Sequence, residues 1–360
     1  MHKYESYKIS ERESIRSAIK KMDEGGIGFI ACLDDNEKVA GIITDGDFRR
    51  AVLQGVDLAG AVATISNHDF LFLSADYRHE QALKMFQDPR VEVLPVLQEG
   101  KLIEVISRVD FVNAKRASLS LKVEKLDLPV VIMAGGKGTR LDPFTRVLPK
   151  PLIPIGRKTI IEIIMDKYAD YGMNTFYVSV NHMAKMIKAY FEEFKSSYKI
   201  NYIEEEQPLG TAGALSLLKG NLNSTFFVSN CDVLLSSDFV QIYNFHKENK
   251  NILTLIASMQ PYVVPYGICE IEKNGELKKI VEKPVYDLLV STGVYMCETG
   301  VLDYIPEEAV FHMTDLINAL KKKGERVGVY PVSQKSWVDI GQWEEYKKAI
   351  KDIVPLDGGD

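Results

Sequence analysis

The sequence predicts an α/β domain, built around a mixed but mostly parallel sheet, that follows a smaller α+β module made of two copies of one unit. Three observations lead to this fold class. The chain has 360 residues, which favours two domains over one. A short pattern that begins at residue 41 returns at residue 104. After residue 128, strand-like and helix-like segments alternate.

Composition and charge exclude several functional classes. Hydrophobic residues make up 46% of the chain and charged residues 26%, as in ordinary globular proteins. The net charge of −6 argues against a nucleic-acid partner, because such proteins carry a basic excess. The four cysteines lie far apart, and the apolar runs are much shorter than the ~18 residues that cross a bilayer. We therefore expect a cytoplasmic protein with no disulfides, no membrane partner and no nucleic-acid partner.

The repeat occupies the first third of the chain. Residues 41–48 (GIITDGDF) and 104–111 (EVISRVDF) share apolar, hydroxyl, Asp and Phe positions. Each copy is preceded by a helical stretch, a short apolar strand and a polar turn typical of a hairpin. The helices are expected at 14–23 and 77–87, and the first strands at 28–33 and 91–97. The repeat predicts two subdomains, about 1–57 and 58–117.

This order of elements resembles a tandem pair of cystathionine-β-synthase (CBS) domains. The resemblance implies a regulatory adenine nucleotide between the copies, with Asp47 and Asp110 on ribose hydroxyls and Thr44 and Ser107 near phosphate. The alternative is that each Thr or Ser, with the Asp three residues later, only caps a helix. In the second copy Arg108 and Val109 replace Asp45 and Gly46, so two equivalent sites are not expected.

The second domain is expected at residues 128–354, after a charged linker at 118–127 and before a tail at 355–360. Residues 128–134 form an apolar run typical of a buried parallel strand. Helices are expected at 160–168, 183–195 and 343–353, and further strands at 175–180, 226–229, 252–257, 267–272 and 292–297. This alternation predicts a sandwich of helices around the sheet, with the ligand at the carboxyl ends of the strands.

A glycine-rich loop follows the first of these strands. It reads GGKGTRL at 135–141 and is followed by LPKPL at 148–152, and it fits neither the Rossmann nor the Walker phosphate motif. Bare backbone N–H groups in such a turn can approach phosphate oxygens, and Arg140 and Lys150 add positive charge. The loop therefore predicts a site for a nucleoside triphosphate, at Ala134, Gly135, Gly136, Gly138 and Thr139.

Residues 129–350 resemble the sugar-1-phosphate nucleotidyltransferases, whose domain is Rossmann-like and of the GT-A type. The motifs that carry the resemblance occur in family order. They are QPLGTAGA at 207–214, NCD at 230–232, YG at 266–267, EKP at 282–284, STGV at 291–294 and WVDIG at 337–341. The resemblance implies attack of a sugar 1-phosphate oxygen on the α-phosphorus of a nucleoside triphosphate, with pyrophosphate displaced in line.

The resemblance also implies roles for single residues. Asp232 and Asp339 would hold Mg²⁺, and Arg140 and Lys150 would act on the triphosphate, so that Arg140, Lys150 and Asp232 are the expected catalytic residues. Lys283 would bind the sugar phosphate and Glu282 the sugar hydroxyls. The other expected contacts are Gln207, Gly210 and Thr211 for the nucleotide, and Gly267 and Thr292 for the sugar phosphate.

The motifs leave the base and the sugar open. A CBS pair ahead of such a domain resembles the guanylyltransferases of bacterial legionaminic acid pathways, which favours GTP with glucosamine 1-phosphate, or with mannose 1-phosphate. A uridylyl- or thymidylyltransferase acting on glucose 1-phosphate is the alternative, and a catalytically inactive nucleotide sensor is the alternative of another class. Because CBS pairs often associate through their helices, a homodimer or homotetramer is expected.

Overall fold

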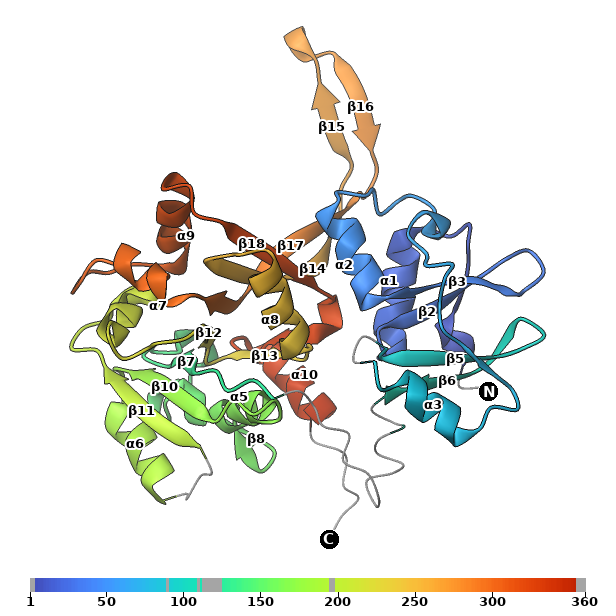
Figure 1. Ribbon diagram of the computed structural model, residues 1–360. Coiled ribbons are helices and arrows are strands. Elements are labelled where there is room, and N and C mark those ends of the chain that lie inside the picture. Colours follow the sequence, from blue (N-terminus) through green and yellow to red (C-terminus); the bar gives the residue numbers. More distant parts are fainter. Residues whose placement is uncertain (1–3, 89–90, 109–110, 112–124, 194–197, 354–360) are drawn as a thin grey trace. The chain divides into compact units, whose positions relative to one another are not determined.

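The computed structural model describes residues 4–88, 91–108, 111, 125–193 and 198–353 (Figure 1). The chain divides into two compact units, residues 1–122 and 123–360. Most of the expected linker at 118–127 and all of the expected tail at 355–360 lie outside the described residues. Among the helices of the described ranges, none combines the length and the apolar character that a membrane crossing requires.

The N-terminal unit contains two sheets of the same construction, which confirms the predicted repeat. In each, two parallel strands are followed by an antiparallel third, in the orders β1-β2-β3 and β4-β5-β6. The strands are β1 (Lys8–Ser10), β2 (Phe29–Leu33), β3 (Val39–Thr44), β4 (Leu73–Ser74), β5 (Val93–Gln98) and β6 (Lys101–Ser107). The helices are α1 (Ile15–Gly25), α2 (Asp45–Leu53) and α3 (His79–Met85).

The two copies share a hydrophobic core. Phe29, Ala31 and Ile42 from the first copy pack with Val93, Leu97 and Leu102 from the second, and all six are buried. A backbone hydrogen bond of 2.8 Å from Val39 N to Gly100 O also joins the two hairpins. Neither copy therefore buries its apolar face alone, which explains why the two copies occur together.

The C-terminal unit is built on a seven-stranded sheet in the order β11-β10-β7-β12-β17-β14-β18. Only β17 runs against its neighbours, so the predicted mostly parallel sheet is confirmed. The strands are β7 (Val130–Met133), β10 (Thr175–Val180), β11 (Lys199–Glu204), β12 (Phe226–Asn230), β14 (Leu253–Val263), β17 (Val285–Cys297) and β18 (Val327–Val332).

Helices cover both faces of this sheet because its central strands are apolar on both sides. Along β7, Val130 and Ile132 join one hydrophobic cluster and Val131 the other. The first cluster includes α5 (Ile160–Ala169), α6 (Ala184–Glu193), α8 (Phe239–Glu248) and α10 (Trp343–Ile353). The second includes α7 (Gly210–Gly213) and α9 (Met313–Lys322). The predicted sandwich is thus confirmed.

The structure differs from the sequence prediction around β14 and β17. Both strands are longer than expected and continue past the sheet as a two-stranded ribbon. The segment expected as a strand at 267–272 forms β15 (Ile268–Ile271), which pairs with β16 (Leu277–Val281) and not with the main sheet (Figure 1). Pro265, which has no N–H to donate, separates β14 from β15.

Four short strands complete the unit. β8 (Pro154–Ile155) pairs with β9 (Lys158–Thr159), and β13 (Val233–Leu235) pairs with β19 (Trp337–Asp339). Thr159 ends β9 and also caps α5: its N–H donates to Glu162 Oε2 at 2.7 Å, and its Oγ1 accepts from Glu162 N at 3.4 Å. This reciprocal cap explains why α5 begins at Ile160.

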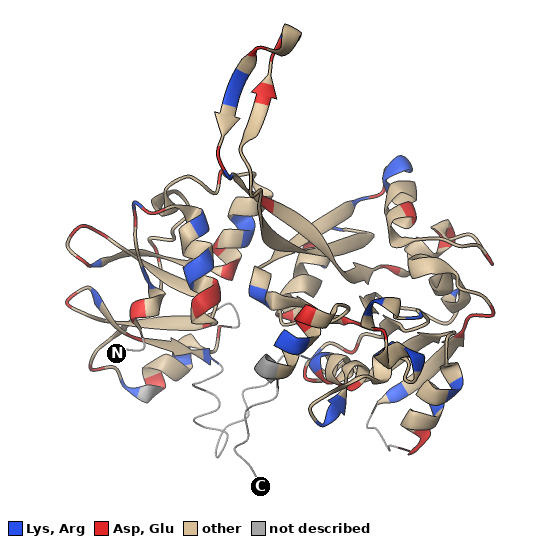
Figure 2. Cartoon of the chain, turned by 180° about the vertical axis from the view of Figure 1, so that it is seen from behind, with Lys and Arg blue, Asp and Glu red and all other residues tan. Residues whose placement is uncertain are grey.

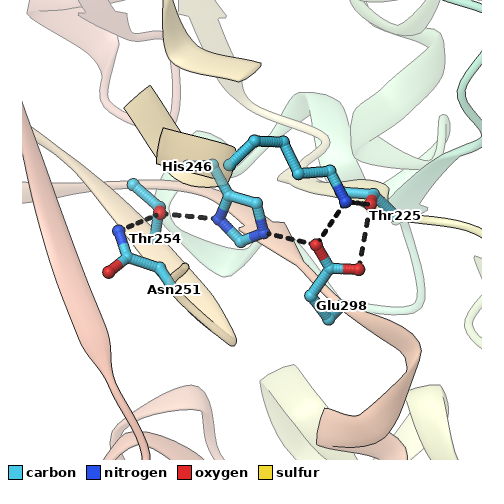
Figure 3. A network of polar contacts seen from close by, with 6 residues as sticks. Thr225, His246, Asn251, Thr254 and Glu298 are labelled. Atoms are coloured by element: carbon cyan, nitrogen blue, oxygen red, sulfur yellow. Dashed lines mark hydrogen bonds and ion pairs between the residues drawn. The ribbon is translucent and has the colours of Figure 1, made fainter. Parts of the chain in front are cut away.

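A polar network ties the sheet together at the edge where β12 and β14 begin and β17 ends (Figure 3). Its His246 and Thr254 are buried, and its Glu298 is partly exposed. His246, at the end of α8, has no exposed surface. Its Nε2 lies 3.1 Å from Glu298 Oε1, and its Nδ1 lies 2.7 Å from Thr254 Oγ1. A carboxylate only accepts, so a neutral His246 donates from Nε2 and accepts at Nδ1 from Thr254.

Burial lowers the pKa of His246 below its usual value, although Glu298 acts in the opposite direction. At pH values below about 6.5, the unfolded chain takes up a proton on this histidine that the folded chain resists. The free energy of unfolding should therefore fall as the pH drops from 7.5 to 5.5. In urea denaturation, His246→Gln should be less stable than the wild type at pH 7.5, by about 1–3 kcal/mol. The difference in the free energy of unfolding between the wild type and the variant should be smaller at pH 5.5. A difference that is the same at both pH values would contradict a neutral His246 in this network.

Candidate functional site

The site lies at the carboxyl edge of the parallel strands of the C-terminal unit. β7 ends at Met133 and leads into the glycine-rich loop, and the adjacent β12 ends at Asn230, two residues before Asp232. Ligands of open α/β sheets bind at this edge. The glycine-rich loop and the first candidate metal carboxylate therefore come from neighbouring strands.

Asp339 reaches the same place through the pairing of β13 with β19. These strands are antiparallel, and Val233 lies opposite Asp339. The Ile340 N–H donates to the Asp232 carbonyl oxygen at 2.8 Å, just beyond the pairing. Two carboxylates that are more than a hundred residues apart in the chain are thus held in fixed register.

Gly341 lies where the charged groups converge. A Cβ at this position would lie 2.6 Å from Asp232 Oδ2, 2.7 Å from Asp339 Oδ1 and 3.0 Å from Lys150 Nζ. The two carboxylate oxygens are therefore no more than 5.3 Å apart. The Gly341 N–H also donates to Asp339 Oδ1 at 2.8 Å. A side chain here would occupy the space that the charged groups share.

Two cations face this pair of carboxylates. Lys150 Nζ donates to Asp232 Oδ2, and both side chains are buried, each 7% exposed. The guanidinium of Arg140, which is exposed, lies 3.6 Å from Asp232 Oδ2 and 3.9 Å from Asp339 Oδ2. The structure thus brings together all four residues that the sequence analysis assigned to catalysis and metal binding.

A cavity of about 190 Å³ opens beside these residues. Besides Arg140, Asp232 and Asp339, its lining comes from β12, β13, β17 and β19, with Asn230, Val233, Ser291, Thr292, Gly293, Tyr295 and Trp337. Thr292 is buried, and its hydroxyl donates to Ile256 O at 2.8 Å, so it shapes the wall. The sequence analysis did not assign Asn230, Tyr295 or Trp337 to the site, although the motifs NCD and WVDIG contain two of them.

The glycine-rich loop packs tightly at one position and is open at another. Gly138 has a φ of 66°, and a Cβ there would lie 2.8 Å from Lys150 Cβ. Gly136 is exposed, with no heavy atom within 4 Å of a Cβ. Ala134 is buried and Thr139 is exposed at the start of a 3₁₀ turn. Gly138 thus allows close contact with Lys150, and Gly136 leaves its backbone accessible.

Glu205 is a residue that the sequence analysis missed. Its carboxylate is buried and accepts hydrogen bonds from the Ser179 hydroxyl and from Leu209 N at 3.0 Å. A Cβ on Gly135 would lie 2.7 Å from Glu205 Oε1. Glu205 therefore links the glycine-rich loop to the loop that contains Gly210. It stands between two exposed glutamates, so the sequence gives no sign that it is buried.

The QPLGTAGA loop is held against the segment before α9. Gly210 has a φ of 82°, and a Cβ there would lie 2.7 Å from Phe311 O. Thr211 Oγ1 accepts from Met313 N at 3.0 Å, which caps the first turn of α9. Gln207 is exposed. Gly210 and Thr211 thus fix the loop, and both Gln207 and Thr211 are exposed.

The residues expected to bind the sugar phosphate do not all meet. Gly267, Glu282 and Lys283 lie at the base of the β15–β16 hairpin, where Glu282 Oε2 is 2.8 Å from the position of a Cβ on Gly267. All three are exposed, and none of them lines the cavity that Thr292 borders. The structure therefore separates them from Thr292 by the length of the ribbon.

In the first CBS copy, the Thr44–Asp47 pair forms a helix cap. Asp47 Oδ2 accepts from Thr44 N at 2.9 Å and from Thr44 Oγ1 at 2.6 Å, and Arg50 contacts Asp47 Oδ1. This geometry matches the alternative that the Thr and the Asp cap a helix without a ligand. In the second copy, Ser107 is buried and Asp110 lies outside the described residues. Nucleotide binding by this unit stays a prediction, which calorimetric titration of the full chain with AMP would test.

Arg108, which replaces Asp45 in the second copy, has a structural role. Its guanidinium donates to Phe86 O at 2.7 Å and, from Nε, to Val91 O at 3.0 Å. The backbone bond from Asp45 N to Gly28 O, at 3.2 Å in the first copy, has a counterpart from Arg108 N to Glu92 O at 2.7 Å in the second. The guanidinium bonds of Arg108 are an addition in the second copy, where they join the end of α3 to the segment before β5.

The donor set fits Mg²⁺. This ion prefers oxygen ligands and is commonly held by one or two carboxylates together with phosphates and waters. Asp232 and Asp339 present carboxylate oxygens within 5.3 Å of each other at a cavity. Within the described part of the chain, no group of three or more His, Cys, Asp and Glu side chains is arranged to hold a metal. In the described part of the chain, the candidate metal ligands at this site are therefore the two carboxylates of Asp232 and Asp339.

Comparison with known proteins agrees with this geometry. The nucleotidyl transferase family profile matches residues 129–354, and the CBS domain profile matches 2–54 and 62–117. A UTP–glucose-1-phosphate uridylyltransferase from Synechocystis is 31% identical over 248 residues, covering 63% of each chain. A mannose-1-phosphate guanylyltransferase catalytic subunit beta from Dictyostelium discoideum is 30% identical over 227 residues, covering 61% of this chain and 62% of its own. The chain thus spans about three-fifths of the length of these curated relatives.

A solved structure is also similar. The crystal structure of HddC from Yersinia pseudotuberculosis has a TM-score of 0.50 and 25% identity, and the match covers 63% of this chain and 99% of HddC. The nucleotidyl transferase profile covers the C-terminal unit, and it matches more than half of the chain. The chain therefore belongs to the nucleotidyl transferase family. In this chain, the nucleotidyl transferase domain follows a tandem pair of CBS domains.

Proposed function

We propose that this protein transfers a nucleotidyl group from a nucleoside triphosphate to a sugar 1-phosphate and releases pyrophosphate. The observation that carries the proposal is the convergence of Arg140, Lys150, Asp232 and Asp339 at the carboxyl edge of the sheet. The similarity to a uridylyltransferase and a guanylyltransferase of sugar 1-phosphates supports it. Fixed cations beside a pair of carboxylates suit a reaction in which all the substrates are polyanions.

The chemistry requires alignment and charge neutralisation rather than a general base. The attacking oxygen belongs to a phosphate and is already anionic. It forms a bond to the α-phosphorus, the bond to the bridging oxygen breaks, and pyrophosphate leaves with the electron pair. Two anions must therefore be held in line against their repulsion. Arg140 and Lys150 offset that repulsion, and the glycine-rich loop supplies backbone N–H groups for the triphosphate.

Asp232 and Asp339 would hold Mg²⁺, which when bound supplies Lewis-acid stabilisation of the phosphate oxygens. The protein contributes the fixed register of β13 and β19, which holds the two carboxylates in place before any ligand arrives. Lys150 is buried against Asp232, so its charge is held at a fixed position and is poorly screened by solvent. Arg140 is exposed and can follow the triphosphate as it enters.

For the base and sugar, we propose GTP with glucosamine 1-phosphate or mannose 1-phosphate. The guanylyltransferase from Dictyostelium discoideum and the resemblance to CBS-fused guanylyltransferases support this choice. The alternative is UTP or dTTP with glucose 1-phosphate, which the uridylyltransferase from Synechocystis supports. The two relatives are 30% and 31% identical to this chain, so identity does not separate the alternatives.

Pyrophosphate release from a matrix of GTP, UTP, dTTP and ATP against glucosamine, mannose and glucose 1-phosphates tests the proposal. GTP should give the highest kcat/KM, with glucosamine or mannose 1-phosphate as the acceptor.

Asp232→Asn should lower the rate at least ~100-fold, because it removes one carboxylate from the candidate metal pair. Circular dichroism and the melting temperature control for loss of fold, since Lys150 would remain buried beside a neutral partner. No turnover of any pair by the wild type would contradict the enzyme and favour a nucleotide sensor.

Glu205 generates a separate prediction about nucleotide binding. In Glu205→Gln the side chain keeps its size, but the charge is lost and one of the two acceptor oxygens becomes an NH₂ donor. The Ser179 hydroxyl can turn to accept from this NH₂ group, so Leu209 N keeps an acceptor, but a neutral and weaker one. We therefore expect the KM for the triphosphate to rise by up to about tenfold. The KM for the sugar 1-phosphate should change little.

Glu206→Gln is the matched control, because Glu206 is exposed and adjacent in the chain. It should leave both KM values unchanged. Equal KM values for the triphosphate in Glu205→Gln and the wild type would show that this carboxylate does not position the nucleotide loops.

A further inference from the structure

The segment at residues 262–290, which we call the arm, concentrates exposed apolar side chains. It consists of the outer ends of β14 and β17 and the β15–β16 hairpin, which project from the sheet of the C-terminal unit (Figure 1). In the described part of the chain, eighteen large hydrophobic residues are exposed, and ten of them lie in the arm. They are Tyr262, Val263, Tyr266, Ile271, Leu277, Ile280, Tyr286, Leu288, Leu289 and Val290.

The β15–β16 hairpin has one apolar face. Residues directly opposite each other in an antiparallel pair share a face, and alternate residues along a strand do too. Cys269 pairs with Ile280 and Ile271 pairs with Leu277, so these four residues lie on one face. Glu270 and Lys279 form the pair between them and point to the other side. The exposed fractions of Ile271, Leu277 and Ile280 are 68%, 56% and 59%.

The ribbon that carries the hairpin has exposed apolar residues on both faces. Tyr262 pairs with Tyr286, and Leu288 and Val290 follow Tyr286 at alternate positions of β17, so these four share one face, whereas Val263 and Leu289 lie on the other. β14 pairs with β18 only from Leu253 to Ser258, and β17 pairs with β12 only from Val294 to Cys297. Among the strands that the structure describes, no other pairs with the outer ribbon, so its backbone edges are open as well. Unpaired edges and an uncovered apolar face are typical of an association surface.

The charge of the arm indicates which partner it fits. Within 268–281, the three glutamates Glu270, Glu272 and Glu276 are balanced by the three lysines Lys273, Lys278 and Lys279. In the cartoon of Figure 2, one strand of the hairpin carries acidic positions (red) and the other basic positions (blue). This stretch is therefore neutral, and the whole arm carries a net charge of −1 in a chain of net charge −6. A strongly charged partner would gain little attraction here, and a second arm would meet little repulsion.

We propose that the arm is the surface through which two copies of this chain associate. An exposed large apolar side chain presents on the order of 100 Å². Seven of the ten lie on the two faces described, Tyr262, Ile271, Leu277, Ile280, Tyr286, Leu288 and Val290, and together they approach the roughly 800 Å² per partner of a standard interface. A soluble monomer rarely exposes an apolar patch of this size. Identical copies meet through the same surface on each, and the apolar face of the hairpin can pack on its counterpart in that way.

Sedimentation velocity of the full chain at micromolar concentration tests this interface without using activity. The wild type should sediment as a dimer or a larger even-numbered assembly. Ile271→Lys combined with Ile280→Lys places two charges on the apolar face and should raise the dissociation constant of the dimer at least tenfold. Met186→Lys is the matched control, because Met186 is an exposed apolar residue on α6 of the same unit, and it should leave the assembly unchanged.

Cys269 supplies a second test that needs no destabilising substitution. It is exposed on the apolar face, whereas Cys32, Cys231 and Cys297 are buried. Mild oxidation should yield a disulfide-linked dimer of the wild type, and Cys269→Ser should yield none. A wild type that sediments as a monomer overturns the proposal. The proposal is also overturned if the assembly is unchanged in the double lysine variant and oxidation gives no dimer linked through Cys269. The interface would then lie elsewhere, as in the CBS unit.

Discussion

Two carboxylates held within 5.3 Å of each other repel, and much of the C-terminal unit is arranged so that Asp232 and Asp339 remain there. The pairing of β13 with β19 sets their register, and the missing side chain of Gly341 makes room for them. Lys150 and Arg140 offset the repulsion from the side of the glycine-rich loop. The loop itself needs Gly138 so that it can pack against Lys150. Together these features hold the carboxylate pair in place.

Stability and candidate chemistry are placed at opposite edges of the sheet. The network of His246, Glu298 and Thr254 lies where β12 and β14 begin, and the charged cluster lies beyond the end of β12. The network is buried at His246 and Thr254, and it joins α8 to the start of β14 and the end of β17. This arrangement leaves the carboxyl edge to loops that need glycine rather than packing. The proposed arm interface uses a third region, the part of β14 and β17 that extends past the sheet.

Local patterns predicted most of the fold, and long-range contacts account for what they missed. The apolar run of β7 and the internal repeat are visible in the sequence itself, and both were predicted. The buried position of Glu205 depends on Ser179 and Leu209, and its two flanking glutamates look the same in the sequence. The family motifs indicated Asp232 and Asp339, but not that Gly341 separates them. The sequence also placed 267–272 as an ordinary strand, because nothing local shows that the ribbon leaves the sheet.

The central claim is that the shared position of Asp232, Asp339 and Lys150, rather than their charges alone, enables the reaction. Pyrophosphate release by Gly341→Ala tests it most directly, because this change removes no charged group and its Cβ would lie 2.6 Å from Asp232 and 2.7 Å from Asp339. We predict a fall of at least ~100-fold, as for a misplacement of about 1 Å. Gly300→Ala is the control, since its Cβ would meet only Ile252 at 3.6 Å. Wild-type rates in Gly341→Ala would contradict the account.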